Sequence, residues 1–311
     1  MRIFVAGAGG AIGRSLVPQL VAAGHEVVAT TQRQEKVQEL CALGVHGVAM
    51  DGLDAGSVGE AVARAEPEAV IHQMTALPIS PDLRHFDREF ARTNELRTRG
   101  TDHLLAAADA VGVRRFVAQS FTGWPNRRSG GPVKTEDDPL EPDPPGQRES
   151  LEAIRYLEHA VLNAEPIEGI VLRYGSFYGP GTGFDEEFPA LIRKRKLPLV
   201  GGGGAVWSFV HIDDAAAATV IAIERGAPGI YNIVDDDPAP VAEWLPYLAA
   251  SLGAPPPWHV PAWLARLAIG EAGVALMTKI RGSSNEKAKR ELGWEPRRHS
   301  WREGFGEALA A

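Results

Sequence analysis

The sequence predicts an α/β fold, a doubly wound parallel sheet with a smaller C-terminal lobe. Short apolar runs alternate with stretches of helical spacing over about the first 175 residues, and a glycine-rich turn directly follows the first run. Repeated strand–helix–strand units form right-handed crossovers, which place helices on both faces of a parallel sheet. After about residue 175, Pro and Gly become frequent and the alternation loosens, which indicates a separate lobe.

Six compact runs rich in Val, Ile and Phe are predicted as strands: residues 2–6, 26–31, 45–50, 68–73, 114–119 and 169–173. Apolar residues with helical spacing lie between them, as at Ile12, Leu16 and Leu20, and a last helical segment is predicted at 285–294. We expect residues 1–175, completed by part of 206–235, to form the sheet domain. The remainder of 176–311 is expected to form a discontinuous lobe over the carboxyl ends of the strands, where ligands bind in such sheets.

Composition excludes several classes of protein. The formal net charge of -8 and pI near 5.6 argue against nucleic-acid binding, which needs a basic face. No apolar run reaches the roughly 18 residues that span a bilayer, so no membrane association is expected. The single cysteine, Cys41, and a start without a leader pattern predict a cytoplasmic protein. The consecutive Asp235, Asp236 and Asp237 are interpreted as a solvated turn, and no metal site is predicted.

The strongest chemical signal is the turn "VAGAGGAIGRSLV", in which Gly7, Gly10 and Gly13 fall three residues apart between the first strand and the first helix. Gly7 permits a tight turn, Gly10 lets backbone N–H groups approach a pyrophosphate, and Gly13 lets the helix pack against the sheet. The phosphates then lie at the positive end of the helix. This placement predicts dinucleotide binding.

The end of the second strand decides between NAD and NADP. A carboxylate there binds the adenosine ribose, whereas an Arg accommodates a 2'-phosphate. The sequence has Thr31 and Arg33 at this point, and its first acid is Glu35. We therefore expect NADP to be preferred over NAD, although Arg33 could also be a plain surface residue.

Further motifs resemble those of the extended short-chain dehydrogenase/reductase family, the NAD-dependent epimerase/dehydratase group. They are "VAMDGLD", "AVIHQMTA", "RTNELRTRGTDHLLAAADAVGVRRFVAQS", "VLRYGSFYGPGTG", "FVHIDDAAAA" and "RELGWEP", and they cover nearly the whole chain. The resemblance implies a Rossmann-type fold with possible homodimer formation. It implies that the cofactor is bound by Gly7, Gly10, Ala11, Ile12, Gly13, Thr31, Arg33, Asp51, Gly52, Gln73, Met74, Thr75, Asn94, Tyr174 and Phe177.

The resemblance fails at the group that should donate a proton. The family pattern is a Ser or Thr after the fifth strand and a Tyr-x-x-x-Lys on the next helix. Ser120 matches the first position, with Thr122 as a second hydroxyl, but Ser150 and Ile154 stand at the Tyr and Lys positions. No Tyr occurs four residues before a Lys anywhere from 140 to 165. Ile154 belongs to an apolar stripe and cannot lower the pKa of a phenol.

Several residues are candidates to replace the missing pair or to bind the substrate. Glu149 enters the helix near the expected site and is the proposed proton donor, with Arg148, Trp124 and Ser176 as substrate contacts. The long loop 124–147, dense in Pro, Gly and charge, is expected to cover a site or to be disordered. Three tryptophans of the second half are candidates for the pocket wall: Trp207, Trp258 and Trp263.

Two functions remain open from the sequence. The first is an NAD(P)-dependent oxidoreductase or epimerase-like enzyme that acts on a small carbonyl or hydroxyl compound, with Ser120 and Thr122 polarising the substrate oxygen and a nonstandard proton donor. The second is an NAD(P)-binding protein without redox turnover, either a sensor or a nonredox catalyst that uses the same pocket. The absence of the Tyr and Lys of the family pattern favours the second function, and the intact cofactor motifs are compatible with both.

Overall fold

The computed structural model describes residues 1–78, 80–184 and 187–310 of the chain. Its centre is a seven-stranded sheet in which every neighbouring pair is parallel, in the order β12-β7-β5-β4-β1-β2-β3. Six of these strands match the six predicted runs to within two residues: β1 (Arg2–Ala6), β2 (Glu26–Thr31), β3 (His46–Ala49), β4 (Ala69–His72), β5 (Arg115–Phe121) and β7 (Glu168–Tyr174). The seventh, β12 (Gly229–Ile233), was not predicted. The predicted α/β fold is confirmed.

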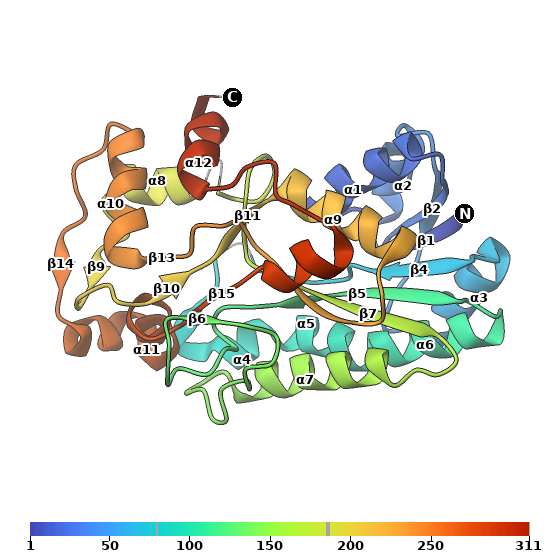
Figure 1. The fold of residues 1–311 in the computed structure, drawn as a ribbon, viewed down its shortest axis with the longest axis horizontal. Coiled ribbons are helices and arrows are strands. Elements are labelled where there is room, and N and C mark those ends of the chain that lie inside the picture. The colour runs from blue at the N-terminus through green and yellow to red at the C-terminus, as the bar shows by residue number, and fades with distance from the viewer. Residues whose placement is uncertain (79, 185–186, 311) are drawn as a thin grey trace.

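Helices cover both faces of this sheet (Figure 1). One face packs on α1 (Ala11–Ala22), α2 (Val37–Cys41) and α9 (Ile212–Arg225), and the other on α3 (Ala55–Ala65), α6 (Thr101–Ala110) and α7 (Arg148–Leu162). Successive strand residues alternate between the two cores, as Ile3 and Val5 do against Phe4 and Ala6. Because both faces are buried, the strands are apolar throughout, which is why they stand out in the sequence.

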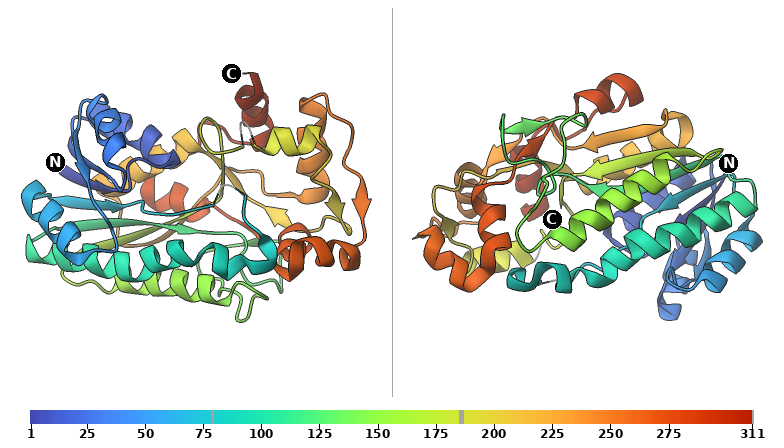
Figure 2. Two further views of the ribbon diagram at one scale, coloured as in Figure 1. Left: turned by 180° about the vertical axis from the view of Figure 1, so that it is seen from behind. Right: turned by 90° about the horizontal axis from the view of Figure 1, so that it is seen from below.

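A third core belongs to the lobe at the carboxyl ends of the strands (Figure 2). Large aromatic rings fill it, including Phe209, Trp244, Trp301 and Phe305, all at most 1% exposed. The helices of this part are α8 (Glu187–Arg193), α10 (Val241–Ser251), α11 (Ala262–Thr278) and α12 (Trp301–Ala310). Its strands form short pairs: β8 (Ser176–Tyr178) with β11 (Phe209–His211), β9 (Leu199–Val200) with β14 (His259–Val260), and β10 (Val206–Trp207) with β13 (Ala239–Pro240).

The second half of the chain also contributes to the sheet layer, through α9 and β12. The helical segment predicted at 285–294 contains a turn of π-helix, η4 (Ala288–Leu292). The proposed domain boundaries stay predictions. No helix in the described ranges combines the length and the apolar character needed to cross a membrane.

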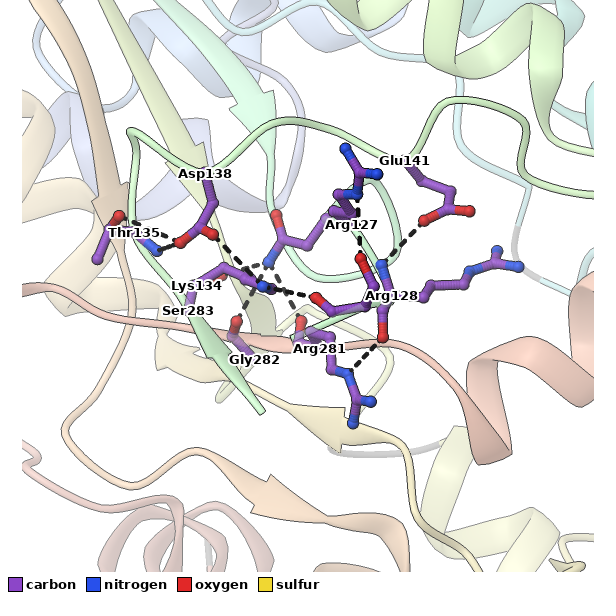
Figure 3. A network of polar contacts seen from close by, with 11 residues as sticks. Arg127, Arg128, Lys134, Thr135, Asp138, Glu141, Arg281, Gly282 and Ser283 are labelled. Carbon is purple, nitrogen blue, oxygen red and sulfur yellow. Dashed lines mark hydrogen bonds and ion pairs between the residues drawn. The ribbon is translucent and has the colours of Figure 1, made fainter. Parts of the chain in front are cut away.

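The long loop 124–147 is an ordered part of the structure. Its strand β6 (Val133–Lys134) pairs with β15 (Gly282–Ser283), from the far end of the chain. A network of polar contacts joins the two segments (Figure 3). Lys134 is buried, and its Nζ donates to the Ser129 carbonyl at 2.8 Å and lies 3.3 Å from Asp138 Oδ1. The loop is therefore held against the lobe.

The three consecutive aspartates do not form a solvated turn. Asp235 is 1% exposed, and burial raises the pKa of its carboxyl well above the usual range. Asp236 pairs with Lys289 at 2.7 Å, whereas Asp237 accepts a hydrogen bond from the Ser300 hydroxyl at 2.6 Å. The three side chains diverge, as expected, but they join the end of β12 to the C-terminal segment.

Candidate active site

The glycine turn has the geometry that a pyrophosphate needs. Gly7 has a φ of 88°, which a residue with a side chain rarely adopts. A methyl group at Gly13 would lie 2.0 Å from the Ala8 carbonyl oxygen, so only glycine lets α1 pack this closely. At Gly10 the nearest atom to such a methyl group is 3.6 Å away, and no side chain caps α1. The turn therefore leaves open space in front of the helix N-terminus, which suits a phosphate group.

Thr31 and Arg33 lie at the adenosine end of this turn. A methyl group at Gly9 would be 3.0 Å from Thr31 Oγ1, which places this threonine directly beside the turn. Arg33 is exposed, and its backbone N–H donates to Thr31 Oγ1 at 3.3 Å. The end of β2 thus presents an exposed Arg33, and residues 31–34 include no acid.

The carboxyl ends of β3 and β4 complete the cofactor side of the site. Asp51 is partly exposed and its Oδ1 accepts from the Leu53 N–H at 3.0 Å. Gly52 packs against Met74, whose sulfur would be 2.4 Å from a methyl group at Gly52. Thr75 follows Met74 and is partly exposed. Their roles in cofactor binding stay predictions.

Gln73 and Tyr174 form a buried pair beneath the strand ends. The Gln73 amide donates to the Tyr174 hydroxyl at 3.2 Å, and Gln73 Oε1 is buried without a partner in the described structure. The Tyr174 hydroxyl also lies 2.7 Å from Thr219 on α9, and burial raises the pKa of Tyr174 to about 12. The phenol is enclosed by protein and holds Gln73 in place, and the predicted contact of Tyr174 with the cofactor stays a prediction. Phe177 is partly buried, with its ring 5.2 Å from that of Tyr174.

The positions that the resemblance gives to Tyr and Lys are both buried on α7. Ser150 is 0% exposed, and its hydroxyl donates to Asp87 Oδ1 at 2.7 Å. Asp87, from α4 (Phe86–Glu89), also accepts from the backbone N–H groups of Glu149 and Ser150 and so caps the helix. Ile154 is 1% exposed and packs in the apolar core with Leu151. Neither of these two positions on α7 carries an acidic side chain.

Asn94, predicted to contact the cofactor, is engaged within the protein. It lies on α5 (Ala91–Glu95), donates to Ser150 Oγ at 3.0 Å and accepts from Arg97 at 3.3 Å. Arg97, on η3 (Leu96–Gly100), is buried, and burial lowers its pKa to about 10. Sequence reasoning missed both Asp87 and Arg97. Asp87 belongs to no quoted motif and meets α7 across 63 residues, and the motif that contains Arg97 does not indicate that this side chain is buried beside Asn94.

Ser120 lies at the end of β5 with its hydroxyl proton already engaged. It donates to Glu158 Oε1 at 2.7 Å. Arg173 binds the same carboxylate with two nitrogens, at 2.7 and 2.6 Å, and all three side chains are buried. Ser120 can therefore offer a ligand only its lone pairs unless this hydrogen bond breaks.

Thr122 belongs to a closed ring of three hydrogen bonds. It donates to Asn126 Oδ1 at 3.2 Å, the Asn126 amide donates to Ser283 Oγ at 2.8 Å, and Ser283 lies 2.5 Å from Thr122 Oγ1. Since Oδ1 and Nδ2 of Asn126 have fixed roles, the Ser283 hydroxyl must donate to Thr122. The second hydroxyl of the site is thus also an acceptor toward a ligand.

A small cavity lies next to these hydroxyls, between the strand ends and the lobe. It contains Trp124 and Ser176, both predicted as substrate contacts, and Trp207 of the three predicted wall tryptophans. Trp258 and Trp263 do not line it and are 48% and 67% exposed. The complete lining is Phe121, Thr122, Gly123, Trp124, Ser176, Trp207, Ser208, Leu276 and Ile280.

The candidate donors at the start of α7 lie on its outer side. Arg148 is exposed and forms an ion pair with Glu152, with 3.0 Å between Nε and Oε1. Glu149 is also exposed. Arg148 thus has a helix neighbour as its partner, and both its predicted contact with the substrate and the role of Glu149 as proton donor stay predictions. Tyr156 is exposed and donates to Asp102.

The glycine turn and the order of the sheet strands agree with a comparison against protein families. The model of the NAD dependent epimerase/dehydratase family matches residues 3–234. The chain belongs to this family. It is an NAD(P)-dependent enzyme, and its cofactor is NAD or NADP.

Relatives and solved structures support the assignment. The chain is 44% identical to a 3-diazoavenalumate denitrifying reductase of a Streptomyces species, over 98% of this chain and 99% of that protein. It is 30% identical to a 2-alkyl-3-oxoalkanoate reductase of Stenotrophomonas maltophilia, over 82% and 77%. The fold resembles the UDP-glucose 4-epimerase of Thermus thermophilus, with a TM-score of 0.77 and 24% identity over 100% and 98% of the chains.

Proposed function

We propose that this protein is an NAD(P)H-dependent reductase of a small aromatic diazo or diazonium compound, in which a hydride takes the place of dinitrogen. The observation that carries the proposal is the state of the hydroxyl groups in the site. Ser120 and Thr122 both have their protons bound to internal acceptors, and the positions that the family resemblance gives to Tyr and Lys are Ser150 and Ile154 in this chain.

The chemistry explains why such a site suffices. Reduction of a carbonyl needs a hydride on carbon and a proton on oxygen, and the cavity lining in the described structure includes no carboxyl, imidazole, phenol or ammonium group to supply that proton. An aryl diazonium ion needs no proton: a C–H bond forms, the C–N bond breaks, and its electron pair leaves with N₂. When bound, the reduced nicotinamide would supply the hydride. The relative with 44% identity is named for a denitrifying reduction of a diazo compound.

The residues around the cavity fit a cationic, aromatic substrate. A hydroxyl group whose proton is already engaged offers a substrate only its lone pairs. Such a group stabilises a cationic substrate, but it cannot donate a hydrogen bond to the oxygen of a carbonyl substrate. The rings of Phe121, Trp124 and Trp207 supply apolar walls for an aromatic ring. The exposed Arg33 and the lack of an acid among residues 31–34 favour NADP(H) over NAD(H).

A hydride-transfer assay tests the proposal. The protein is incubated with 3-diazoavenalumate and either NADPH or NADH; absorbance at 340 nm follows cofactor oxidation, and mass spectrometry identifies the product. We expect oxidation with NADPH and a product that has lost N₂ and gained one hydrogen, which becomes deuterium when deuterated NADPH is used. Cofactor oxidation without deuterium in the product would contradict direct hydride transfer.

A ketone panel provides the second arm, because the relative with 30% identity is named as an oxoalkanoate reductase. Reduction of ketones but not of the diazo compound would favour the carbonyl reductase predicted from the sequence. Cofactor binding without oxidation in either arm would favour a protein without redox turnover. The three outcomes are distinct in a single set of measurements.

A further inference from the structure

Two arginines belong to the chain segments that line the cavity, and they connect the long loop to β15. Arg281 directly follows the lining residue Ile280, and Arg128 lies four residues after the lining residue Trp124. Arg281 Nε donates to the Arg128 carbonyl at 2.9 Å. Asn126, of the hydrogen-bond ring, donates to the carbonyl of Arg281 at 3.2 Å. Figure 3 shows both guanidinium groups extending away from Asp138, the acid of this network.

Neither arginine has an acidic partner within the part of the chain that the structure describes. Arg128 NH2 donates to Gln147 Oε1 at 3.3 Å, but its Nε is buried without a partner. Burial lowers the pKa of Arg128, and the nearby carboxylates of Glu141 and Glu271 only partly oppose this effect. Glu141 accepts instead from the Arg128 backbone N–H, at 2.9 Å.

Gln147 adds another unused donor to the same place. Its side chain is 0% exposed, and Nε2 has no partner in the described structure. A buried N–H group without an acceptor destabilises the protein. Two such donors, Arg128 Nε and Gln147 Nε2, next to half-buried guanidinium groups therefore indicate that a ligand supplies the missing acceptor and the missing negative charge.

We propose that Arg128 and Arg281 bind the carboxylate of the substrate, so that the enzyme takes aromatic acids. The inference rests on the proposed function and names the substrate class of the same site. A guanidinium group matches a carboxylate in shape and charge. The aromatic ring of the acid then lies among Trp124, Trp207 and Phe121, and its carboxylate lies at the arginines.

Two other cationic residues of the same loop, Arg127 and Lys134, differ from Arg128 and Arg281 in their surroundings. Arg127 is exposed, and its Nε donates to Ser129 Oγ at 3.0 Å. Lys134 is buried but already paired with Asp138. Arg127 therefore offers a matched control: the same side chain, one residue away, outside the proposed site.

Binding of a stable aromatic acid tests the proposal without any redox step. Calorimetry compares 4-coumarate with its methyl ester, each titrated into the protein saturated with NADP⁺. We expect the acid to bind at least about tenfold more tightly than the ester, as a charge-assisted hydrogen bond implies. Arg128→Met and Arg281→Met should each remove about tenfold of the affinity for the acid and leave the ester unchanged, whereas Arg127→Met should change neither.

Two further measurements keep the result interpretable. NADP⁺ affinity and the melting temperature show that each variant is folded, and Arg281→Lys tests whether charge alone restores part of the affinity. Equal affinities for acid and ester, no binding of either, or discrimination that survives in both Met variants would overturn the proposal. Because 4-coumarate carries no diazo group, failure of the denitrifying reaction leaves this result untouched.

Discussion

Two glycines of the turn are expected to affect different properties when substituted: Gly13 the stability of the protein, and Gly10 the binding of the cofactor. A methyl group at Gly13 would clash with the Ala8 carbonyl, whereas one at Gly10 would make only an ordinary contact, 3.6 Å from the Gly7 carbonyl oxygen. We predict that Gly13→Ala lowers the free energy of unfolding by about 1–3 kcal/mol, because helix and strand must move apart. Gly10→Ala should fold normally and bind NADP⁺ at least about tenfold more weakly, because its methyl group occupies the phosphate position.

Thermal denaturation and cofactor titration of both variants check this pair. Each glycine is the control for the other, since the chemical change is the same. Loss of stability in the Gly10 variant of the size seen at Gly13 would show that the turn is not open. Unchanged NADP⁺ binding by Gly10→Ala would show that phosphates lie elsewhere.

The buried His72 should make the stability of the folded protein depend on pH between about 4 and 6.5. Burial lowers the pKa of this histidine from 6.5 to about 4, and its Nδ1 accepts from the Met74 N–H at 3.2 Å. The unfolded chain takes up a proton near pH 6.5 and the folded chain does not. Stability from neutral His72 is therefore complete above pH 6.5 and falls as pH drops to about 4, by about 3 kcal/mol in total.

Urea denaturation between pH 4 and pH 7 measures this loss. In His72→Asn the amide oxygen can still accept from Met74, but no proton is taken up. We expect the variant to lose about 3 kcal/mol less than the wild type over this range. The same pH dependence in both proteins would assign the acid sensitivity to other groups.

The residues of the site show what the sequence could predict. Ser120, Thr122 and Trp124 follow a recognisable strand, so their place near the strand ends was foreseeable. The partners that decide their chemistry were not, because Glu158 and Ser283 are 38 and 161 residues away. A hydrogen bond between such distant residues leaves no periodic pattern in the sequence.

Among the elements, α7 and β7 are joined by the buried Glu158–Arg173 pair, with the two nearest atoms 2.6 Å apart and both side chains 6% exposed. We predict that Glu158→Ala destabilises the protein by about 3–5 kcal/mol, because Arg173 is left buried and charged. The double variant Glu158→Leu with Arg173→Met should lose clearly less, because neither side chain is then charged. Denaturation curves of the three proteins measure the difference; a larger loss in the double variant would contradict it.

Loop 124–147 illustrates the limit of prediction for an element. Its Pro and Gly content allows either a cover over the site or disorder, and the choice depends on tertiary partners. Asn126 provides one, through the carbonyls of Arg281 and Gly282. A two-residue strand such as β6 is too short to carry a period, so its pairing with β15 could not be predicted.

For the whole molecule, the aromatic core of the lobe should contribute a large share of stability. Phe305 is fully buried and its ring lies 5.3 Å from that of Phe209, whereas Trp263 is 67% exposed. We predict a loss of about 3–5 kcal/mol for Phe305→Ala and less than about 0.5 kcal/mol for Trp263→Ala. Urea titration followed by circular dichroism compares them. Similar losses would mean that the exposed tryptophan is packed in solution.

The architecture as a whole was predictable because the parallel sheet is buried on both faces and its strands are continuous apolar runs. The structure of the lobe was less predictable from the sequence. Its strands are two or three residues long, and its core comes from aromatic residues spread between Tyr178 and Phe305. β12 was missed because "GIYNI" contains a polar residue and follows a helix from the second half of the chain.

The hydrogen-bond ring of Thr122, Asn126 and Ser283 also bears on the order in which the ribosome delivers the parts of the enzyme. The neighbours of the glycine turn, Thr31 and Gln73, are translated within the first quarter of the chain, whereas the last member of the ring follows more than two hundred residues later. During synthesis, the residues around the glycine turn therefore emerge well before the hydrogen-bond ring beside the cavity is complete. Under the proposed function, substrate selectivity thus requires residues from both halves of the chain.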